Sequence, residues 1–179
     1  MGHRLSRIVT RTGDDGSTGL ATGARIAKTH ARVAAMGDAD ELNCCLGLLL
    51  AVPLHDAVRA ALAPCQHELF NLGGELSMPP AQLVGEAHVL RLDQALADLN
   101  ATLPPLKEFV LPGGGEAAAR AHLARAVTRR LERNLWQLHA QEPLNPHTLH
   151  YANRLSDLLF VASRVLARAT GHEAVWQRD

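Results

Sequence analysis

The sequence predicts an all-α protein built as a bundle of five helices. Two observations carry this prediction. Apolar residues recur with helical spacing through most of the chain after about His30, and no segment shows the alternation of a half-buried strand. Proline and glycine residues divide this periodic part into five segments. Because each helix has an apolar face to bury, packing the helices against one another is the natural arrangement.

The five predicted helices follow one another with short breaks between them. Their expected spans are 31–52, 54–76, 86–102, 116–140 and 146–170. The first ends at Pro53, and the second ends before the proline pair at 79–80, with Pro64 expected to kink it or to shift its start. The third ends before the proline pair at 104–105.

The last two predicted helices have clear signals at their ends. The fourth begins after the Pro-Gly-Gly-Gly stretch at 112–115 and ends before Pro143. Asn145 followed by Pro146 is a typical start for the fifth, with asparagine as the N-cap and proline in the first turn. Gly171 is a typical stop.

Three acidic residues in the first predicted helix, Asp38, Asp40 and Glu41, have two interpretations. As first-turn acids they would simply stabilise the helix dipole. Alternatively, one of them is the partner of an arginine elsewhere. Spacing alone leaves both interpretations open.

Composition and charge argue against several classes of protein. At 179 residues, the chain suits one domain that buries roughly two thirds of its unfolded surface. Lysine plus arginine and aspartate plus glutamate balance at 18 each, so no overall field favours nucleic acid or an acidic membrane. Aromatic residues are only 3%, which leaves few platforms for stacking bases. We therefore expect neither nucleic acid nor a membrane as a partner.

Cysteine usage and the lack of targeting signals predict a cytoplasmic protein. Cys44, Cys45 and Cys65 form no C-x-x-C pairs and no even-numbered framework, so we expect buried free thiols in a reducing compartment. The longest apolar run, residues 46–53, is too short to span a bilayer, and the N-terminus has no secretory apolar region. The nine residues before Thr10 leave no room for an organelle transit peptide.

The N-terminal segment 9–20 has the composition of a phosphate-binding loop after a flexible start. Glycines let backbone N–H groups turn inward, while hydroxyls and cations supply further donors to an anion. The residues that indicate this role are Thr10, Arg11, Thr12, Gly13, Gly16, Ser17, Thr18, Gly19 and Lys28. The segment matches neither a Walker loop, nor a Rossmann glycine motif, nor an EF-hand loop. A mobile arm rich in turn residues is the alternative interpretation.

The fourth predicted helix combines an apolar face with a cationic one. At about 100° per residue, Arg125, Arg129, Glu132 and Arg133 share one arc. The apolar residues opposite this arc are Ala124, Val127, Leu131, Leu135 and Leu138. A solvated surface is one interpretation. The arginines outnumber the nearby acids, however, and the bulky Trp136 lies on the same arc, which favours an anion-binding face.

Polar residues border the apolar stripe of the fifth predicted helix. Asn153, Ser156, Phe160 and Ser163 follow helical spacing there, and Asn153 with Asp157 one turn later forms a candidate hydrogen-bond pair between helices. No glutamate is followed by a histidine three residues later, as in the di-iron sites of helical bundles. The sequence therefore predicts no metal centre.

Five ordered blocks resemble those of the PduO-type ATP:cob(I)alamin adenosyltransferases. The blocks are TRTGDDG at 10–16, GDADELN at 37–43, FVLPGG at 109–114, RAVTRRLER at 125–133 and NRLSD at 153–157. They span nearly the whole chain, and five blocks in order are far more specific than any single one.

The resemblance implies a single adenosyltransferase domain over 1–179, with an ATP-binding loop at 1–30 and a ferritin-like, up-and-down five-helix bundle at 31–170 that assembles as a homotrimer. ATP would lie between neighbouring subunits. The ATP-binding residues implied are Thr10, Arg11, Thr12, Gly13, Thr18, Gly19, Lys28, Arg129, Arg130, Glu132, Arg133 and Asn153. The resemblance gives catalytic roles to Arg129, to an intersubunit pair of Asp40 with Arg125, and to Phe109, which would press into the lower face of the corrin ring.

The implied reaction explains the residue types. Cob(I)alamin attacks the 5′ carbon of ATP, which gives adenosylcobalamin and expels triphosphate, so arginines, Lys28 and Mg²⁺ would stabilise the charge on the leaving group. Excluding the lower axial base with Phe109 would ease reduction of cob(II)alamin. The implied partners are a flavin-type reductase and an adenosylcobalamin-dependent enzyme. An ATP-sensing or adenosylcobalamin-delivery oligomer without turnover is the alternative.

Overall fold

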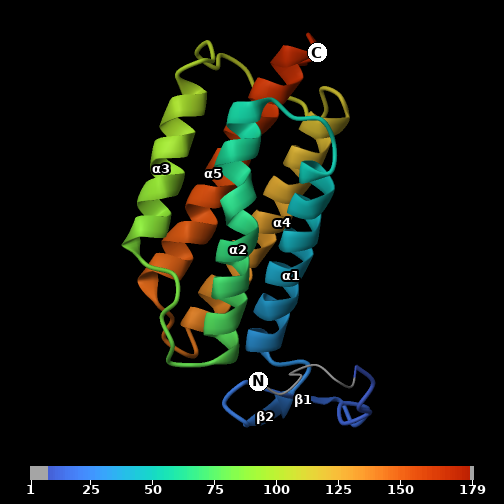
Figure 1. Ribbon diagram of the computed structural model, residues 1–179, viewed down its shortest axis with the longest axis vertical. Helices are drawn as coiled ribbons and strands as arrows, with labels where there is room; N and C mark the ends of the chain where they lie inside the picture. Colours follow the sequence, from blue (N-terminus) through green and yellow to red (C-terminus); the bar gives the residue numbers. More distant parts are fainter. Residues whose placement is uncertain (1–7, 178–179) are drawn as a thin grey trace.

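A computed structural model describes residues 8–177 and contains the five predicted helices. They are α1 (Ala31–Leu50), α2 (Asp56–Ser77), α3 (Glu86–Asn100), α4 (Glu116–His139) and α5 (Pro146–Ala169) (Figure 1). All five helices are confirmed, and their ends lie within two residues of the predicted ends. The first seven residues of the loop predicted at 1–30 lie outside the described part of the chain.

The helices pack around one apolar core. Contacts run in the order α2, α1, α4, α5 and α3, and α3 also touches α2, which closes the bundle. The face of α4 opposite the cationic arc is buried in this core, as predicted. Within residues 8–177, no helix combines the length and the apolar character that crossing a bilayer requires.

The predicted end signals of α5 are confirmed. The Asn145 side chain accepts a hydrogen bond of 3.1 Å from the backbone N–H of His147, and Pro146 occupies the first turn. Gly171 follows the C-cap with a φ of 72°, the left-handed conformation that ends helices. Pro64 lies inside α2 and does not shift its start, which His55 caps through its imidazole Nδ1.

The expectation that the chain has no strand is wrong. The strands β1 (Ser17–Gly19) and β2 (Arg25–Ala27) form an antiparallel hairpin, with Thr18 opposite Ile26. Gly23, with a φ of 89°, lies in the turn that joins them. Strands of three residues are too short to show an alternating pattern, so the sequence does not reveal them.

Two further expectations need correction. Cys44 is exposed, whereas Cys45 and Cys65 are buried, because Cys44 lies on the side of α1 away from the core. The interpretation of Asp38, Asp40 and Glu41 as first-turn acids is also wrong, since α1 begins at Ala31 and has no acid in its first turn.

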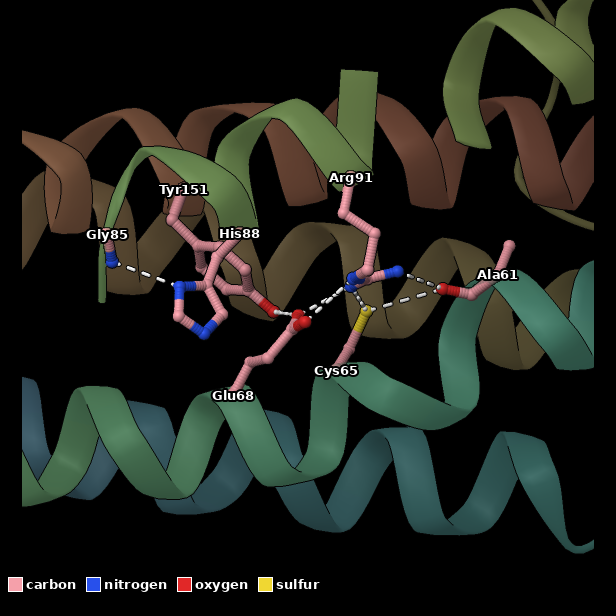
Figure 2. Close-up of polar contacts among 7 residues, drawn as sticks. All are labelled: Ala61, Cys65, Glu68, Gly85, His88, Arg91 and Tyr151. Atoms are coloured by element: carbon pink, nitrogen blue, oxygen red, sulfur yellow. Dashed lines mark hydrogen bonds and ion pairs between the residues drawn. The ribbon is translucent and has the colours of Figure 1, made fainter. Parts of the chain in front are cut away.

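A buried polar cluster ties α2, α3 and α5 together (Figure 2). The Arg91 Nε donates to Glu68 at 2.7 Å, and the Tyr151 hydroxyl donates to the same carboxylate at 2.8 Å. Arg91 also donates to the carbonyl of Ala61 at 3.1 Å and lies 3.3 Å from the Cys65 sulfur. Burial opposes the charge of Arg91, but the hydrogen bonds and charge interactions with Glu68 and Cys65 together outweigh it and raise the pKa of the guanidinium.

The loop before α4 depends on one glycine. Gly114 has a φ of 91°, and a Cβ added there would lie 2.5 Å from the Cβ of Ala167 in α5. We expect Gly114→Ala to lower the free energy of unfolding by about 1–3 kcal/mol because it adds backbone strain and a clash. Gly113→Ala is the matched control, since nothing lies within 4 Å of the added Cβ. Urea unfolding measures both, and equal losses would contradict the prediction.

Candidate active site

The N-terminal loop places Lys28 beside Gly13. The backbone N–H of Lys28 donates to the carbonyl of Gly16 at 2.8 Å, which folds the end of the hairpin back on the loop. The Lys28 ammonium then lies 3.2 Å from the point where a Cβ on Gly13 would be. A side chain at position 13 would therefore displace this cation. The structure thus brings together two of the residues predicted to bind phosphate.

Arg25, which sequence reasoning missed, organises the same loop. Its guanidinium donates to the Ser17 hydroxyl, with 3.1 Å between Nε and Oγ, and to the carbonyl of Thr12 at 2.5 Å. Asp15 accepts from the N–H of Ser17 at 2.9 Å and from its hydroxyl at 2.7 Å, and these bonds lower the pKa of the aspartate. Arg25 could only have been found by predicting the hairpin that turns it toward Ser17.

The remaining predicted loop residues are accessible to a ligand. Thr10 and Thr12 share a hydrogen bond of 3.0 Å between their hydroxyls, and both side chains are exposed. Arg11 between them has a φ of 59°, unusual for a residue with a side chain. Thr18 and Gly19 lie in β1, where Thr18 is half-buried and Gly19 is exposed.

The cationic arc of α4 is present as predicted. Arg129 and Arg133 are exposed, and the Arg133 guanidinium donates to the carbonyl of Arg129 at 3.1 Å. Arg125 is half-buried, with its guanidinium carbon 6.0 Å from the centre of the Phe160 ring. Burial, and then the charge of Arg129, lower the pKa of Arg125. Across residues 8–177, none of these three arginines forms an ion pair, so the arc carries uncompensated positive charge.

A polar junction joins the arc to α5. The Asn153 side chain donates to Glu132 at 3.0 Å, so the expected hydrogen bond between helices exists, but its acceptor is Glu132 rather than Asp157. Asp157 is exposed on the same side. Partial burial of its carboxyl group still raises its pKa; the charge of Arg154 opposes this shift, and that of Glu132 adds to it. Glu132 and Asn153 thus lie together beside the arginines.

Arg130 has acidic partners on α1, whereas its neighbour Arg129 has no ion pair within residues 8–177. Its guanidinium contacts Glu41 and donates to Asp38 at 2.9 Å, and Asp38 also accepts from Asn134 at 2.5 Å. Asp38 is buried between α1 and α4, so this contact fixes the two helices against each other. The second interpretation of the α1 acids, that one of them is the partner of an arginine, is therefore confirmed for Asp38.

Asp40 and Arg125 are not paired within the chain. Asp40 is exposed and lines a groove between α1 and α2, together with Asn43, Gly73 and the 72%-exposed Phe70. Arg125 lies on α4 beside Phe160 of α5.

Phe109 and the N-terminal loop lie at opposite ends of the bundle. The hairpin lies below the start of α1 in Figure 1, whereas the connection from α3 to α4, which carries Phe109, lies at the upper end. The Phe109 side chain is 76% exposed. One chain by itself does not bring the predicted phosphate loop and Phe109 into a single site.

His122 is a second residue that sequence reasoning missed. It is only 4% exposed, and within the described chain neither ring nitrogen has a hydrogen-bond partner. Its ring meets Phe160 edge-on, with 6.4 Å between centroids, and lies near Arg125. Burial, and then the charge of Arg125, lower the pKa of His122, which favours the neutral imidazole. No group of three or more metal-ligating side chains occurs within residues 8–177.

Known proteins resemble this chain over nearly its full length. The sequence profile described as Cobalamin adenosyltransferase matches residues 8–166. A cobalamin adenosyltransferase of Cupriavidus metallidurans is 55% identical over 100% of this chain and 98% of its own length. A corrinoid adenosyltransferase of Mycobacterium tuberculosis is 43% identical over 92% of this chain and 91% of its own.

Solved structures agree with the sequence comparisons. A variant PduO-type ATP:corrinoid adenosyltransferase from Lactobacillus reuteri, complexed with cobalamin and ATP, has a TM-score of 0.88 and 30% identity, and the match covers 96% of this chain and 100% of that chain. Another variant of that enzyme, complexed with ATP, has a TM-score of 0.85 and 31% identity over 95% of this chain and 100% of its own. The chain therefore belongs to the cobalamin adenosyltransferase family, and its reaction is the transfer of an adenosyl group from ATP to a corrinoid.

Proposed function

We propose that this chain transfers the 5′-deoxyadenosyl group of ATP to the cobalt of cob(I)alamin and releases inorganic triphosphate. The observation that carries this proposal is the arc of arginines on α4 that have no ion pair within residues 8–177, in a chain whose charges balance overall. The cobalt(I) electron pair forms the new bond to the 5′ carbon, and the electrons of the broken carbon–oxygen bond leave with the triphosphate. The protein therefore supplies alignment and charge stabilisation rather than a nucleophile.

The residues divide this work between two surfaces. Thr10 to Gly13, Thr18, Gly19 and Lys28 bind the triphosphate from the N-terminal loop. Arg129 and Arg133 stabilise the charge that develops on the leaving oxygen, while Glu132 and Asn153 fix the nucleotide beside them. The predicted contact of Arg130 with the nucleotide stays a prediction, since its guanidinium already contacts two carboxylates.

The active unit is a homotrimer of ferritin-like, up-and-down bundles, with ATP held between neighbouring subunits. Two features of the single chain support this assembly. The phosphate loop and Phe109 lie at opposite ends of the bundle, and Asp40 and Arg125 are not in contact. In the trimer, Asp40 of one subunit would meet Arg125 of the next, close to the exposed ring of Phe70.

Mg²⁺ accompanies the triphosphate. This ion is usually bound by one or two carboxylates together with phosphate oxygens and waters. Asp14 fits that role, because it is exposed on the loop and its carboxylate has no hydrogen bond within the described residues, whereas Asp15 is engaged with Ser17. When bound, the ion would neutralise part of the triphosphate charge.

Free thiols support a reducing compartment, and we place the protein in the cytoplasm. A flavin-type reductase would supply the reduced corrinoid, and an adenosylcobalamin-dependent enzyme would use the product.

The test of the function is turnover by the purified protein. ATP, Mg²⁺ and chemically reduced cob(I)alamin are mixed with it, and the spectral change to adenosylcobalamin is followed together with triphosphate release. We expect both products in equal amounts. ATP binding without product would instead indicate a nucleotide sensor or a delivery protein.

Phe109→Ala should impair the reduction of cob(II)alamin more than the transfer of the adenosyl group to cob(I)alamin. An apolar ring that displaces the lower axial base makes cob(II)alamin easier to reduce, but it is not needed once cob(I)alamin has formed. We expect the variant to lose at least about 10-fold more activity in the assay that starts from cob(II)alamin, which corresponds to about 1.4 kcal/mol in the reductive step. Leu106→Ala, in the same exposed loop, is the control. Equal losses in the two assays would argue against the wedge.

A further inference from the structure

The C-terminal segment turns back from α5 and pairs with the loop that carries Phe109. After Gly171, the backbone N–H of His172 donates to Ala167 at 2.9 Å, which reverses the chain. The N–H of Trp176 then donates to the carbonyl of Phe109 at 2.7 Å, and the N–H of Leu111 donates to Ala174 at 2.9 Å. These bonds form an antiparallel bridge around Val110 and Val175.

Glu173 anchors this segment to α5. Its carboxylate accepts a hydrogen bond of 2.8 Å from Arg164 and one of 2.7 Å from Arg168. The two arginines lie one turn apart on the helix. The Glu173 and Arg164 side chains are 10% and 5% exposed, so the pair is shielded from solvent. Burial opposes ionisation of the carboxyl, but the hydrogen bonds and the charges of the two arginines together outweigh it and hold the pKa of Glu173 below its ordinary value.

Arg164 holds the Phe109 loop as well as the tail. Its guanidinium donates to Glu173 on one side and to the carbonyl of Pro104 on the other, at 3.2 Å. At the far end of the same loop, Gly114 packs on Ala167, and the Thr170 hydroxyl lies 3.4 Å from the Gly114 carbonyl. The loop is therefore fixed at both ends by α5 and in the middle by the C-terminal segment.

Phe109 itself has little packing to hold it. With 76% of its surface exposed, its position depends on the hydrogen bonds of its own backbone to the C-terminal segment. We propose that Glu173 is a positioning residue, which fastens the C-terminal segment to α5 and thereby holds Phe109 where the corrinoid binds. This inference rests on the proposed role of Phe109, although the fastening itself does not.

Loss of the Glu173 contact should weaken binding of the corrinoid but not of ATP. Releasing the segment would loosen the middle of the Phe109 loop, which the backbone bonds of Phe109 and Leu111 hold. The arginine arc and the N-terminal loop would keep their own contacts. Ordering a loose loop when the corrinoid binds weakens its apparent affinity. The residues proposed to bind ATP keep their contacts, so the affinity for ATP should be unaffected.

Glu173→Gln tests the proposal, with Glu116→Gln as the matched control. Glu116 has an ion pair with Arg120 and is 67% exposed, so the control removes the same charge from a carboxylate that, among the described residues, has no hydrogen bond to the C-terminal segment. We expect Glu173→Gln to raise the KM for cob(I)alamin about 10-fold and to change the KM for ATP less than about 2-fold. Glu116→Gln should change neither. An equal rise in both KM values would indicate general destabilisation and overturn the proposal.

Trp176 provides a readout that needs no turnover. In a Trp136→Phe background, it is the only tryptophan, and its fluorescence anisotropy and quenching by acrylamide report whether the segment is held. We expect Glu173→Gln to lower the anisotropy and to increase quenching. Unchanged fluorescence would refute the fastening, and released fluorescence with an unchanged corrinoid KM would refute the positioning role. If the wild-type protein lacked turnover, the proposed function would fail, and fluorescence would still decide the fastening.

Should Glu173→Gln fail to fold, Arg168→Ala replaces it. The Arg168 side chain is 46% exposed, so its loss leaves Glu173 paired with Arg164 and is easier to tolerate. We expect smaller changes in the same direction: a higher KM for cob(I)alamin, a lower anisotropy of Trp176 and stronger quenching. Their absence in a folded variant would count against the proposal.

Discussion

Arg129→Ala should reduce turnover by about 10- to 200-fold while leaving the stability of the protein unchanged. Arg129 is exposed on α4, and within residues 8–177 its side chain has no ion pair or hydrogen bond that its removal would break. Each hydrogen bond to a charged group contributes about 1.5–3 kcal/mol, and Arg129 is proposed to donate to the departing triphosphate. Steady-state kinetics from preformed cob(I)alamin measures the loss.

Two variants make this prediction specific. Arg129→Lys keeps the charge but loses the planar pair of donors, so we expect it to retain more activity than the alanine variant. Arg120→Ala removes an arginine from the same helix, where it pairs with Glu116 outside the arc, and should leave turnover nearly unchanged. Near-normal activity of Arg129→Ala in a correctly assembled protein would remove this residue from the site.

Arg91→Ala should have the largest effect on stability. Among residues 8–177, it would leave the Glu68 carboxylate, which is 9% exposed, with only the Tyr151 hydroxyl as a hydrogen-bond donor (Figure 2). Removing one partner of a buried ion pair costs about 3–5 kcal/mol, since the other charge stays buried. Arg91 also contacts Ala61 and Cys65 of α2, so its loss would weaken the packing of α3 against α2. Urea unfolding followed by circular dichroism measures the change.

The partner residue supplies the control. In Arg91→Met combined with Glu68→Leu, neither charge remains, so we expect much of the lost stability to return. The Arg59 guanidinium donates only to carbonyls at the end of α1 among the described residues, so Arg59→Ala should lower the free energy of unfolding far less. A loss below about 1 kcal/mol in Arg91→Ala would show that Glu68 finds water instead of remaining buried.

Helix positions were predictable because their signals are local. Prolines at 79–80 and the glycines at 113–115 interrupt the periodic pattern, and Asn145 with Pro146 determines where α5 begins. The hairpin escaped prediction because its pairing depends on contacts between short strands rather than on a repeating pattern. Cys44 shows a limit of predicting burial from residue type. Its apolar surroundings in the sequence favoured burial, but its position around α1 leaves it exposed.

The candidate site was predictable where its residues share one helix face. The arc of Arg125, Arg129 and Arg133 follows from spacing alone, and the structure reproduces it. Contacts between distant segments did not follow. Nothing in the spacing connects Arg25 with Thr12 or Glu173 with Arg164, because these pairs form only after the chain has turned back on itself.

The adjacent arginines 129 and 130 show how strongly the position of a residue around α4 determines what it contacts. A step of one residue turns a helix by about 100°, which is why Arg129 faces solvent while Arg130 meets Asp38 and Glu41 on α1. Deleting a single residue upstream within α4 would rotate everything after it, so that Leu131 and Leu135 would leave the core while a guanidinium entered it. Changes of length should therefore be confined to the connecting segments, and this helix should vary only by substitution.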